Sequence, residues 1–437
     1  MKKRRIFLGV LELGGMMERL NNAFHEMGME SDFYCVENDF FFGEKNDKPI
    51  LKKYRVHTSR KKNAAREWEK TLWSVFQMWD ILHAFFYVLL RYDLFIYIYG
   101  RGMFFYNRYL RKVEELEFFI LKIFRKKMVM WLCGSDSRAP YCNGAFCGEY
   151  SVAKLYSMTL EKAKRVRMLE KYMVLIDNPA SSHFHTKPYV IFDCIEIPID
   201  EEEMVQNSKR ANDKITILHA PSNQKIKGTT RIRNIIKEIK EEGYDFEYIE
   251  VSGVPHEVVR EKMAKADIVI DQLYCDTPKA IFATEAALNG VPVVIGGYYA
   301  DVYKEVLPSP IAPTVFCNPE ELKEKLIYLI GHKEERDRIG KAEREYVENH
   351  CFARNVANNF MKIFDDVYPR EWIMNPADNN YIWGIGLEKK VIADEIVKLI
   401  DCYGTEALCL DKNGILYKRY LQLYNECKKN SEGEVEV

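Results

Sequence analysis

The 437-residue sequence has no excess of charge of either sign. It contains 64 basic and 65 acidic residues, so no overall electrostatic field favours nucleic acid as a partner. It also lacks an uncharged apolar run of about twenty residues, the length that a transmembrane helix requires. The nearest candidate, residues 79–99, is interrupted by Asp80, Arg91 and Asp93. The sequence therefore argues against nucleic-acid binding and against a membrane-spanning protein.

A disulfide framework and a metal-ligand motif are absent as well. The eleven cysteines are scattered, and the spacing of Cys142 and Cys147 does not match a zinc site. We expect His183 and His185 to lie in a surface loop. The apolar run after MKKRR is too short and too mixed for a signal peptide and predicts a first strand instead. We therefore expect a cytoplasmic protein without a metal or other cofactor.

Aromatic residues are frequent, at 13% of the chain, and many lie between positions 60 and 127. Basic clusters border this region at Arg60-Lys61-Lys62 and Arg125-Lys126-Lys127. One interpretation is a surface that meets lipid or a lipid-linked acceptor, which would place the protein peripherally at the inner face of a membrane. The alternative is a helical core with basic ends whose charges reach solvent. We expect a helix over residues 65–90 and a polar loop over residues 43–64.

The most informative stretch is ADIVIDQLYCDTPKAIFATEAALNGVPVVIGG, residues 266–297. Its β-branched run predicts a buried parallel strand that ends near Asp271. A polar loop, a helix over about 280–289 and a second strand follow, which together form a βαβ unit. Ligands of open α/β sheets bind at the loops that leave the strands' carboxyl ends. Glu285, a carboxylate among small apolar residues, is a candidate ligand-binding residue, although a solvated surface position is the alternative.

A second informative stretch is ILHAPSNQKIKGT, residues 217–229. It predicts a strand, a turn through Ser222 and Asn223, and a helix that opens at Lys227-Gly228. A lysine at a helix N-terminus opposes the helix dipole, which suggests that Lys227 shares an anionic ligand with the helix amides. An ordinary surface lysine is the alternative.

These two segments, in this order and at this separation, resemble the donor-binding segments of family-four-type retaining glycosyltransferases of the GT-B fold. The resemblance covers about residues 4–368 and implies two Rossmann-like domains that face each other across a cleft. It implies an N-terminal acceptor-side domain at 1–198 and a nucleotide-sugar-binding domain at 214–352, with a charged linker between them. A crossover helix at 353–368 would pack back on the first domain. A helical extension of unassigned role, either partner contact or a helical cap, would follow at 369–437.

The resemblance also assigns roles to individual residues. Glu285 matches the residue that holds the nucleotide ribose, and Val254 would pack on the base. Lys227, Glu285 and Asp136 are the catalytic candidates. The predicted donor-binding residues are Gly14, Gly15, Ser222, Asn223, Lys225, Gly228, Val254, Thr277, Lys279 and Ala280.

Three positions depart from the family pattern. Ser222 stands where an Arg is usual, and we expect Lys225 to supply the missing charge. Thr277 replaces a sugar-contacting Glu, with Asp276 beside it. In VMWLCGSDSR, Cys133 replaces a His.

Two segments of the first domain are predicted to face the cleft. Asp136 could orient a sugar hydroxyl, and Arg138 could bind an acidic acceptor; a local Asp–Arg pair is the alternative. Gly14 and Gly15 separate the first strand from a helix and form either an anion site or a plain tight turn.

The expected function is transfer of a sugar from a UDP- or GDP-sugar to a saccharide or lipid-linked acceptor, with retention and without a metal. A growing surface polysaccharide or glycolipid is the expected acceptor. A non-catalytic GT-B relative that binds a nucleotide sugar or partner proteins is the first alternative. A membrane-surface adaptor is the second.

Overall fold

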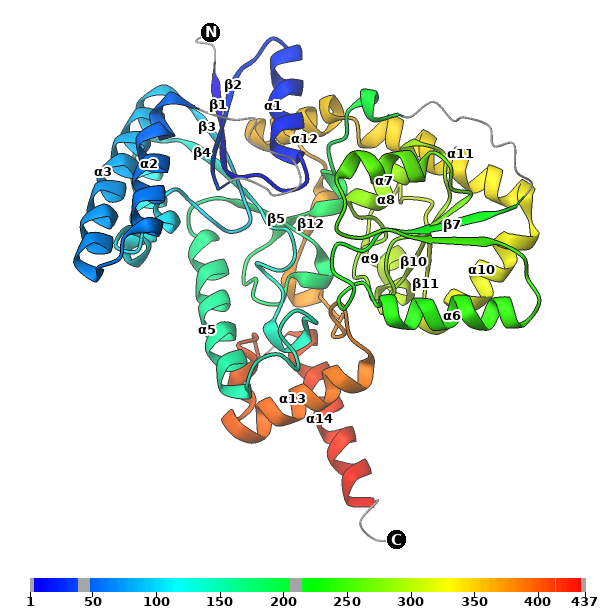
Figure 1. Cartoon of the computed structure of the whole chain (residues 1–437). Coiled ribbons are helices and arrows are strands. Elements are labelled where there is room, and N and C mark those ends of the chain that lie inside the picture. Colours follow the sequence, from blue (N-terminus) through cyan, green and yellow to red (C-terminus); the bar gives the residue numbers. More distant parts are fainter. Residues whose placement is uncertain (1–3, 38–47, 205–213, 413, 434–437) are drawn as a thin grey trace.

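The computed structural model describes residues 4–37, 48–204, 214–412 and 414–433 and contains two mostly parallel sheets (Figure 1). The first has the strand order β12-β6-β5-β4-β3-β1-β2, and the second has the order β11-β10-β9-β7-β8. Every pairing between neighbours is parallel except that of β12 with β6. The expected α/β architecture with two Rossmann-like sheets is therefore confirmed.

Helices cover both faces of the first sheet. Its strands are β1 (Arg5–Leu11), β2 (Glu30–Glu37), β3 (Leu94–Ile98), β4 (Lys127–Trp131), β5 (Val174–Asp177), β6 (Tyr189–Ile191) and β12 (Ile373–Met374). Helices α1 (Met16–Glu26) and α12 (Ala353–Asp365) share one hydrophobic cluster on one face. On the other face pack α3 (Glu67–Arg91), α4 (Glu114–Ile123) and α5 (Val152–Leu169). Each strand is buried on both sides, which explains the continuous apolar runs.

The second sheet lies between 216 and 317. Its strands are β7 (Thr216–His219), β8 (Glu247–Glu250), β9 (Ile268–Ile270), β10 (Val293–Gly296) and β11 (Val315–Cys317). The helices around it are α6 (Thr229–Glu241), α7 (His256–Met263), α8 (Ile281–Leu288), α9 (Tyr303–Val306), α10 (Leu322–Gly331) and α11 (Lys333–His350). The predicted strand, loop and helix over 268–288 are confirmed by β9 and α8.

Two sequence-based expectations about local structure were wrong. Residues 49–63 form the helix α2 (Pro49–Asn63) rather than a loop, because Leu51 and Tyr54 give it a narrow buried face against α3. Residues 43–47 of that predicted loop, and 205–213 of the predicted linker, lie outside the described residues. The two-residue strand β12 was not expected, since the strand that it pairs with, β6, lies about 180 residues earlier.

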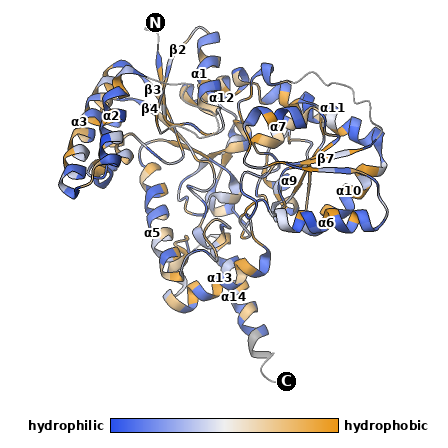
Figure 2. Ribbon diagram, in the orientation of Figure 1, coloured by the Kyte–Doolittle hydropathy of each residue, from blue (hydrophilic) through white to orange (hydrophobic). Residues whose placement is uncertain are grey.

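Helix α3 carries an apolar stripe that faces solvent. By length and composition it could cross a membrane, although 39% of its most apolar window is buried in the fold. Its inner side packs through Ile81, Phe85 and Val88, and Figure 2 shows the alternation of polar and apolar residues around α2 and α3. The exposed apolar side chains are Trp68, Leu72, Phe76, Trp79, Phe86 and Leu90.

The C-terminal extension is folded against the rest of the chain. It comprises β12, the helix α13 (Lys389–Tyr403) and the helix α14 (Ile415–Gly433). α13 packs on α5, and Tyr420 of α14 is completely buried. Its buried residues therefore belong to the larger hydrophobic cluster of the protein, and Figure 1 shows α13 at the end of α5, with the last turns of α14 extending away from the body.

Candidate functional site

A pocket of about 530 Å³ lies between the two sheets. Loops that follow the carboxyl ends of the strands form it, including those after β1, β4, β7, β8 and β9. This is the position at which open α/β sheets bind ligands. The lining includes Leu13, Gly14, Tyr99, Cys133, Arg138 and Asn178 from one half, and Ser222, Lys227, Val254, His256, Asp276, Thr277, Lys279, Ala280 and Glu285 from the other.

Most of the residues singled out from the sequence come together here. Those in the lining are Gly14, Arg138, Ser222, Lys227, Val254, Thr277, Lys279, Ala280 and Glu285. Among the described residues, the lining does not include Asp136, Gly15, Asn223, Lys225 or Gly228.

Glu285 is buried, with 4% of its surface exposed, so the solvated alternative was wrong. His256 Nε2 lies 2.9 and 3.0 Å from the two carboxylate oxygens and donates to them, and this bond raises the pKa of His256. Arg19 of α1 lies 3.8 Å from the same carboxylate and 2.5 Å from Glu203. Sequence reasoning missed His256 and Arg19, because each is distant in sequence from Glu285. The carboxylate is thus held between two cationic partners at the pocket wall.

Lys227 also has a carboxylate partner. Its Nζ donates to Asp271 Oδ1 at 2.7 Å, and Asp271 is buried directly after β9. The surface-lysine alternative was wrong, since the side chain is only 16% exposed. Oδ2 of Asp271 has no hydrogen-bond partner among the described residues. The pair places one cation in the pocket and brings the loops after β7 and β9 together.

Arg138 binds the opposite half of the protein rather than its sequence neighbour. Its guanidinium donates through Nε to Asp276 Oδ2 at 2.7 Å and makes a second contact through Nη2, with both residues buried. The local Asp136–Arg138 pair, considered as the alternative, does not form. Asn178 Nδ2 donates to the backbone carbonyl of Asp276 at 3.0 Å. Arg138 therefore joins the two sheets beside the pocket.

Asp136 is buried behind the pocket lining. Its Oδ1 accepts the Cys133 N–H at 2.9 Å, while Oδ2 has no partner among the described residues. Burial, reinforced by the nearby charge of Asp177, raises the pKa of Asp136 to about 7. Its position supports the loop after β4 rather than contact with a sugar.

The side-chain ammonium of Lys279 is already held by protein groups. Nζ pairs with Glu196 and lies 3.1 Å from Cys351 Sγ. The hydroxyl of Thr277 donates to the Lys279 carbonyl at 2.9 Å. The pocket therefore meets this loop mainly through its backbone and through Ala280, the N-cap of α8.

Lys225 does not supply the charge missing at Ser222. It is exposed and pairs with Glu149 of the other half. The Asn223 side chain accepts the Ile226 N–H at 3.1 Å, and Gly228 caps α6 with φ of 69°. These residues shape the turn that presents Lys227.

The Gly14-Gly15 loop contains its own anion. The carboxylate of Glu12 accepts backbone N–H groups from Leu13 at 2.8 Å, Met17 at 3.1 Å and Glu18 at 3.0 Å. Burial raises the pKa of Glu12 to about 7 despite these bonds. The amides that begin α1 were predicted as an anion site, and an internal carboxylate already occupies them. Gly14 itself touches Ile281 of α8, since a Cβ there would lie 2.3 Å from Ile281 Cδ1.

The two histidines expected in a surface loop are buried. His185 contacts Asp177 at 3.0 Å and Glu170 at 3.1 Å, and His183 contacts Tyr420 of the extension at 3.0 Å. Each histidine is therefore held through Nε2 by a protein group, while Nδ1 of each has no hydrogen-bond partner among the described residues. Across the part of the chain that is described, no group of three or more His, Cys, Asp or Glu side chains is arranged to hold a metal ion.

The sequence matches no protein-family model and no curated protein. Solved structures are similar in fold. A sucrose-phosphate synthase from Thermosynechococcus elongatus is 14% identical, with a TM-score of 0.50 over 83% of this chain and 99% of that chain. Anabaena HepE in complex with UDP and glucose is 11% identical, with a TM-score of 0.45 over 83% and 99%. The catalytic domain of Arabidopsis thaliana starch synthase IV is 10% identical, with a TM-score of 0.42 over 83% and 99%.

The similarity to the synthase identifies the fold, because the two structures match over nearly all of the synthase chain. The chain has the GT-B fold. At this identity the likeness concerns architecture, and function has to be argued from the site.

Proposed function

We propose that the protein is a retaining glycosyltransferase that moves a sugar from a nucleotide-sugar donor to an acceptor bound between the two halves. The observation that carries the proposal is Glu285, a buried carboxylate held by His256 in the wall of a 530 Å³ pocket. A fixed carboxyl group that accepts from two vicinal hydroxyls is suited to a nucleotide ribose. The resemblance of the segments 217–229 and 266–297 points to the same role.

The rest of the pocket suits the other parts of a UDP- or GDP-sugar. Val254 lines it beside His256 and offers an apolar contact for a base. Lys227 and the N-terminal amides of α8 would bind the diphosphate, since Ala280 cannot cap that helix with its side chain. Asp276, held by Arg138, lies beside Thr277 and takes the place of the carboxylate that Thr277 lacks at the sugar.

The proposed reaction replaces one bond to the anomeric carbon by another on the same face of the sugar. The bond to the diphosphate oxygen breaks, the bond to the acceptor oxygen forms, and the acceptor proton passes to the departing phosphate. Lys227 would stabilise the negative charge that develops on this leaving group. Gly14 approaches Ile281 of the other half closely at the pocket, and we expect this approach to limit the access of water to the reacting centre.

We further propose a lipid-linked or surface saccharide acceptor at the cytoplasmic face of a membrane. The exposed stripe on α3 supports this, with Trp79 63% and Leu90 78% exposed. Arg60, Lys61 and Lys62 at the end of neighbouring α2 add positive charge, a combination suited to an anionic lipid surface. Trp79→Glu should reduce cosedimentation with vesicles of anionic phospholipid, and unchanged binding would contradict this part of the proposal.

A second candidate function is nucleotide-sugar binding without transfer. The observation that favours it is the pairing of the pocket cations: Lys227 with Asp271, Arg138 with Asp276, and Lys279 with Glu196. These pairs leave less positive charge for a leaving diphosphate than unpaired cations would.

The two functions are separated by following donor consumption. Purified protein is incubated with UDP-glucose, GDP-mannose and ADP-glucose, and release of the nucleoside diphosphate is measured with and without candidate saccharides. Transfer or donor hydrolysis that falls by about 10- to 100-fold in Lys227→Ala and Glu285→Ala supports the enzyme, as loss of one or two charge-assisted bonds requires. Tight donor binding without turnover supports the second candidate. Equal turnover in wild type and both variants would overturn the site assignment.

A further inference from the structure

The segment Tyr381–Lys389, which we call the strap, touches both halves of the protein beside the pocket. It follows β12 in the first sheet and leads into α13. Two hydrogen bonds hold it against the first half. The side chain of Asn379, just before it, donates to the Pro179 carbonyl at 2.9 Å, and Tyr420 of α14 donates to the Ile382 carbonyl at 2.9 Å.

Consecutive strap residues bind opposite halves. Ile385 N–H donates to the Cys142 carbonyl at 3.2 Å, and the Ile385 carbonyl accepts the Gly144 N–H at 2.8 Å. The next N–H, of Gly386, donates to the Tyr274 carbonyl at 2.9 Å. Two residues of one chain segment therefore join the 139–147 loop of the first half to the 271–280 loop of the second.

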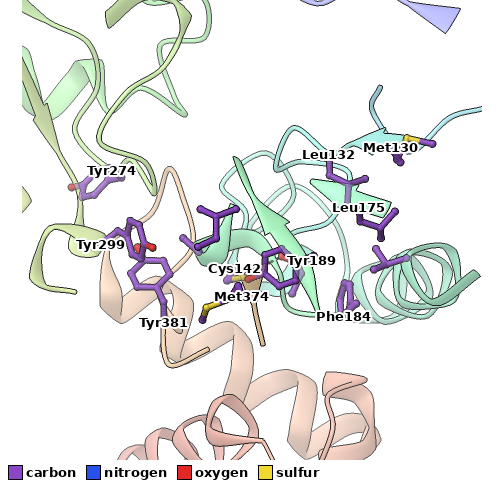
Figure 3. Packing of buried hydrophobic residues seen from close by; sticks show 14 of the residues in the cluster. Met130, Leu132, Cys142, Leu175, Phe184, Tyr189, Tyr274, Tyr299, Met374 and Tyr381 are labelled. Carbon is purple, nitrogen blue, oxygen red and sulfur yellow. Dashed lines mark hydrogen bonds between the residues drawn. The ribbon is translucent and has the colours of Figure 1, made fainter. Parts of the chain in front are cut away.

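Side chains extend this junction over the second half. Tyr381 meets Tyr299 edge to face at 5.0 Å, and the Lys389 ammonium lies 4.5 Å from the centre of the Tyr298 ring. The hydroxyl of Tyr274 donates to Glu388 at 3.1 Å. Figure 3 shows Tyr274, Tyr299, Tyr381 and Cys142 in this region, contributed by three different parts of the chain.

Glycines allow the backbones to approach this closely. A Cβ at Gly144 would lie 2.6 Å from the Gly386 carbonyl oxygen, and one at Gly384 would lie 1.8 Å from that of Cys142. A Cβ at Gly386 would lie 3.2 to 3.3 Å from Ile226, the residue before Lys227. The strap thus reaches the 221–228 loop as well.

The three contacted loops are those that carry pocket residues of the proposed site. Lys227 belongs to the 221–228 loop, and Asp276 and Thr277 belong to the 271–280 loop. Arg138 directly precedes the 139–147 loop and pairs with Asp276. The strap and the Arg138–Asp276 pair are therefore parts of one junction between the halves.

We propose that the strap is a positioning element that holds these three loops together and keeps the two halves closed around the donor pocket. The importance of this for catalysis rests on the proposed function, whereas the mechanical coupling of the loops does not. The C-terminal extension, to which the strap belongs, would then hold the two halves in the closed arrangement before the donor binds. In other enzymes, binding of the substrate induces this closure.

Hydrogen exchange of the full-length protein without ligand tests the coupling. Gly144→Ala forces the loop away from Gly386 without placing a side chain at a positive φ. Gly331→Ala is the matched control, because no neighbouring heavy atom lies within 4 Å of its Cβ. The proposal predicts exchange faster by about tenfold in Gly144→Ala over the strap and the 139–147, 221–228 and 271–280 loops together, with α10 and α11 unchanged. Faster exchange of the strap alone, or equal changes in the control, would overturn it.

A milder variant serves if Gly144→Ala does not fold. Tyr274→Phe removes only the hydroxyl bond to Glu388 and should accelerate exchange in the same segments by a smaller factor. No change in exchange outside the peptide that contains residue 274 would overturn the proposal.

UDP-glucose affinity is then measured for the folded variants and wild type. Weaker binding in the variant supports the positioning role. Wild-type affinity in a variant whose loops exchange faster would overturn it. Failure of wild type to bind any nucleotide sugar would count against the proposed function. The hydrogen-exchange result would still test whether the strap couples the three loops.

Discussion

The β1–α1 and β9–α8 segments have the same local design but different electrostatics. Each places a loop and a helix N-terminus at the pocket, and they lie in different halves of the molecule (Figure 1). In the first, Glu12 accepts the amides of Met17 and Glu18. In the second, α8 begins after Ala280, which has no side-chain oxygen to accept them.

The comparison shows that a helix N-terminus becomes a ligand site only if the chain does not supply the anion itself. A carboxylate inside the loop has a high effective concentration, so a phosphate must displace it from three hydrogen bonds. The second half is therefore the better place for a diphosphate. This conclusion is tested by variants that change the stability or the donor affinity of the protein through one segment and not through the other.

Arg138→Ala should have the largest effect, because it removes the ion pair that joins the two segments' halves. Asp276 would remain buried without its partner, which destabilises proteins by about 3–5 kcal/mol. The free energy of unfolding in urea measures this loss. Lys225→Ala is the control, since it breaks an exposed interdomain pair with Glu149 and should change the free energy of unfolding little, because solvent screens such pairs. Similar losses in both variants would show that the buried pair is not special.

Neutralising the two carboxylates should affect donor binding unequally. Glu285→Gln is expected to weaken UDP-glucose binding by about 1.5–3 kcal/mol, or roughly 10- to 100-fold, because a charged acceptor of ribose hydroxyls is lost. Glu12→Gln should change the dissociation constant by no more than about twofold, since Glu12 binds backbone amides of its own loop. Calorimetric titration of both variants provides the comparison, which fails if the ranking is reversed.

The third prediction is a dependence of stability on pH that comes from Asp136, and its effect per pH unit is the smallest of the three. Its folded pKa of about 7 lies well above the ordinary aspartate value of about 3.9, so the folded state binds more protons than the unfolded state between these values. The free energy of unfolding should therefore fall as pH rises from about 4 to 7, by at most about 1.4 kcal/mol per pH unit from this group. Denaturant unfolding at several pH values, for wild type and Asp136→Asn, measures the slope. A slope that is the same in both proteins would contradict the assignment.

The sequence was sufficient for the features that depend on local pattern. The β-branched run before Asp271 and the small residues around Glu285 predicted β9 and α8, because burial on both faces of a parallel sheet leaves a continuous apolar run. The position of Lys227 just before a helix was also predicted correctly, from the Lys227-Gly228 turn that precedes α6.

Features that depend on distant partners could not be predicted in this way. Arg138 pairs with Asp276, 138 residues later, and His183 is covered by Tyr420, 237 residues later. The role of Glu12 was missed although it is local, because the sequence does not show that its carboxylate turns back toward the amides of Met17 and Glu18.

The central claim is that a nucleotide binds on the β7–β9 side of the pocket, against Glu285. The most direct measurement is thermal unfolding with UDP, GDP, ADP and their sugar conjugates, for wild type and Glu285→Ala. We expect one nucleotide class, at about 100 times its dissociation constant, to raise the free energy of unfolding of wild type by about 2.7 kcal/mol. The same nucleotide should raise that of the variant much less. Equal stabilisation of both proteins, or of neither by any nucleotide, would contradict it.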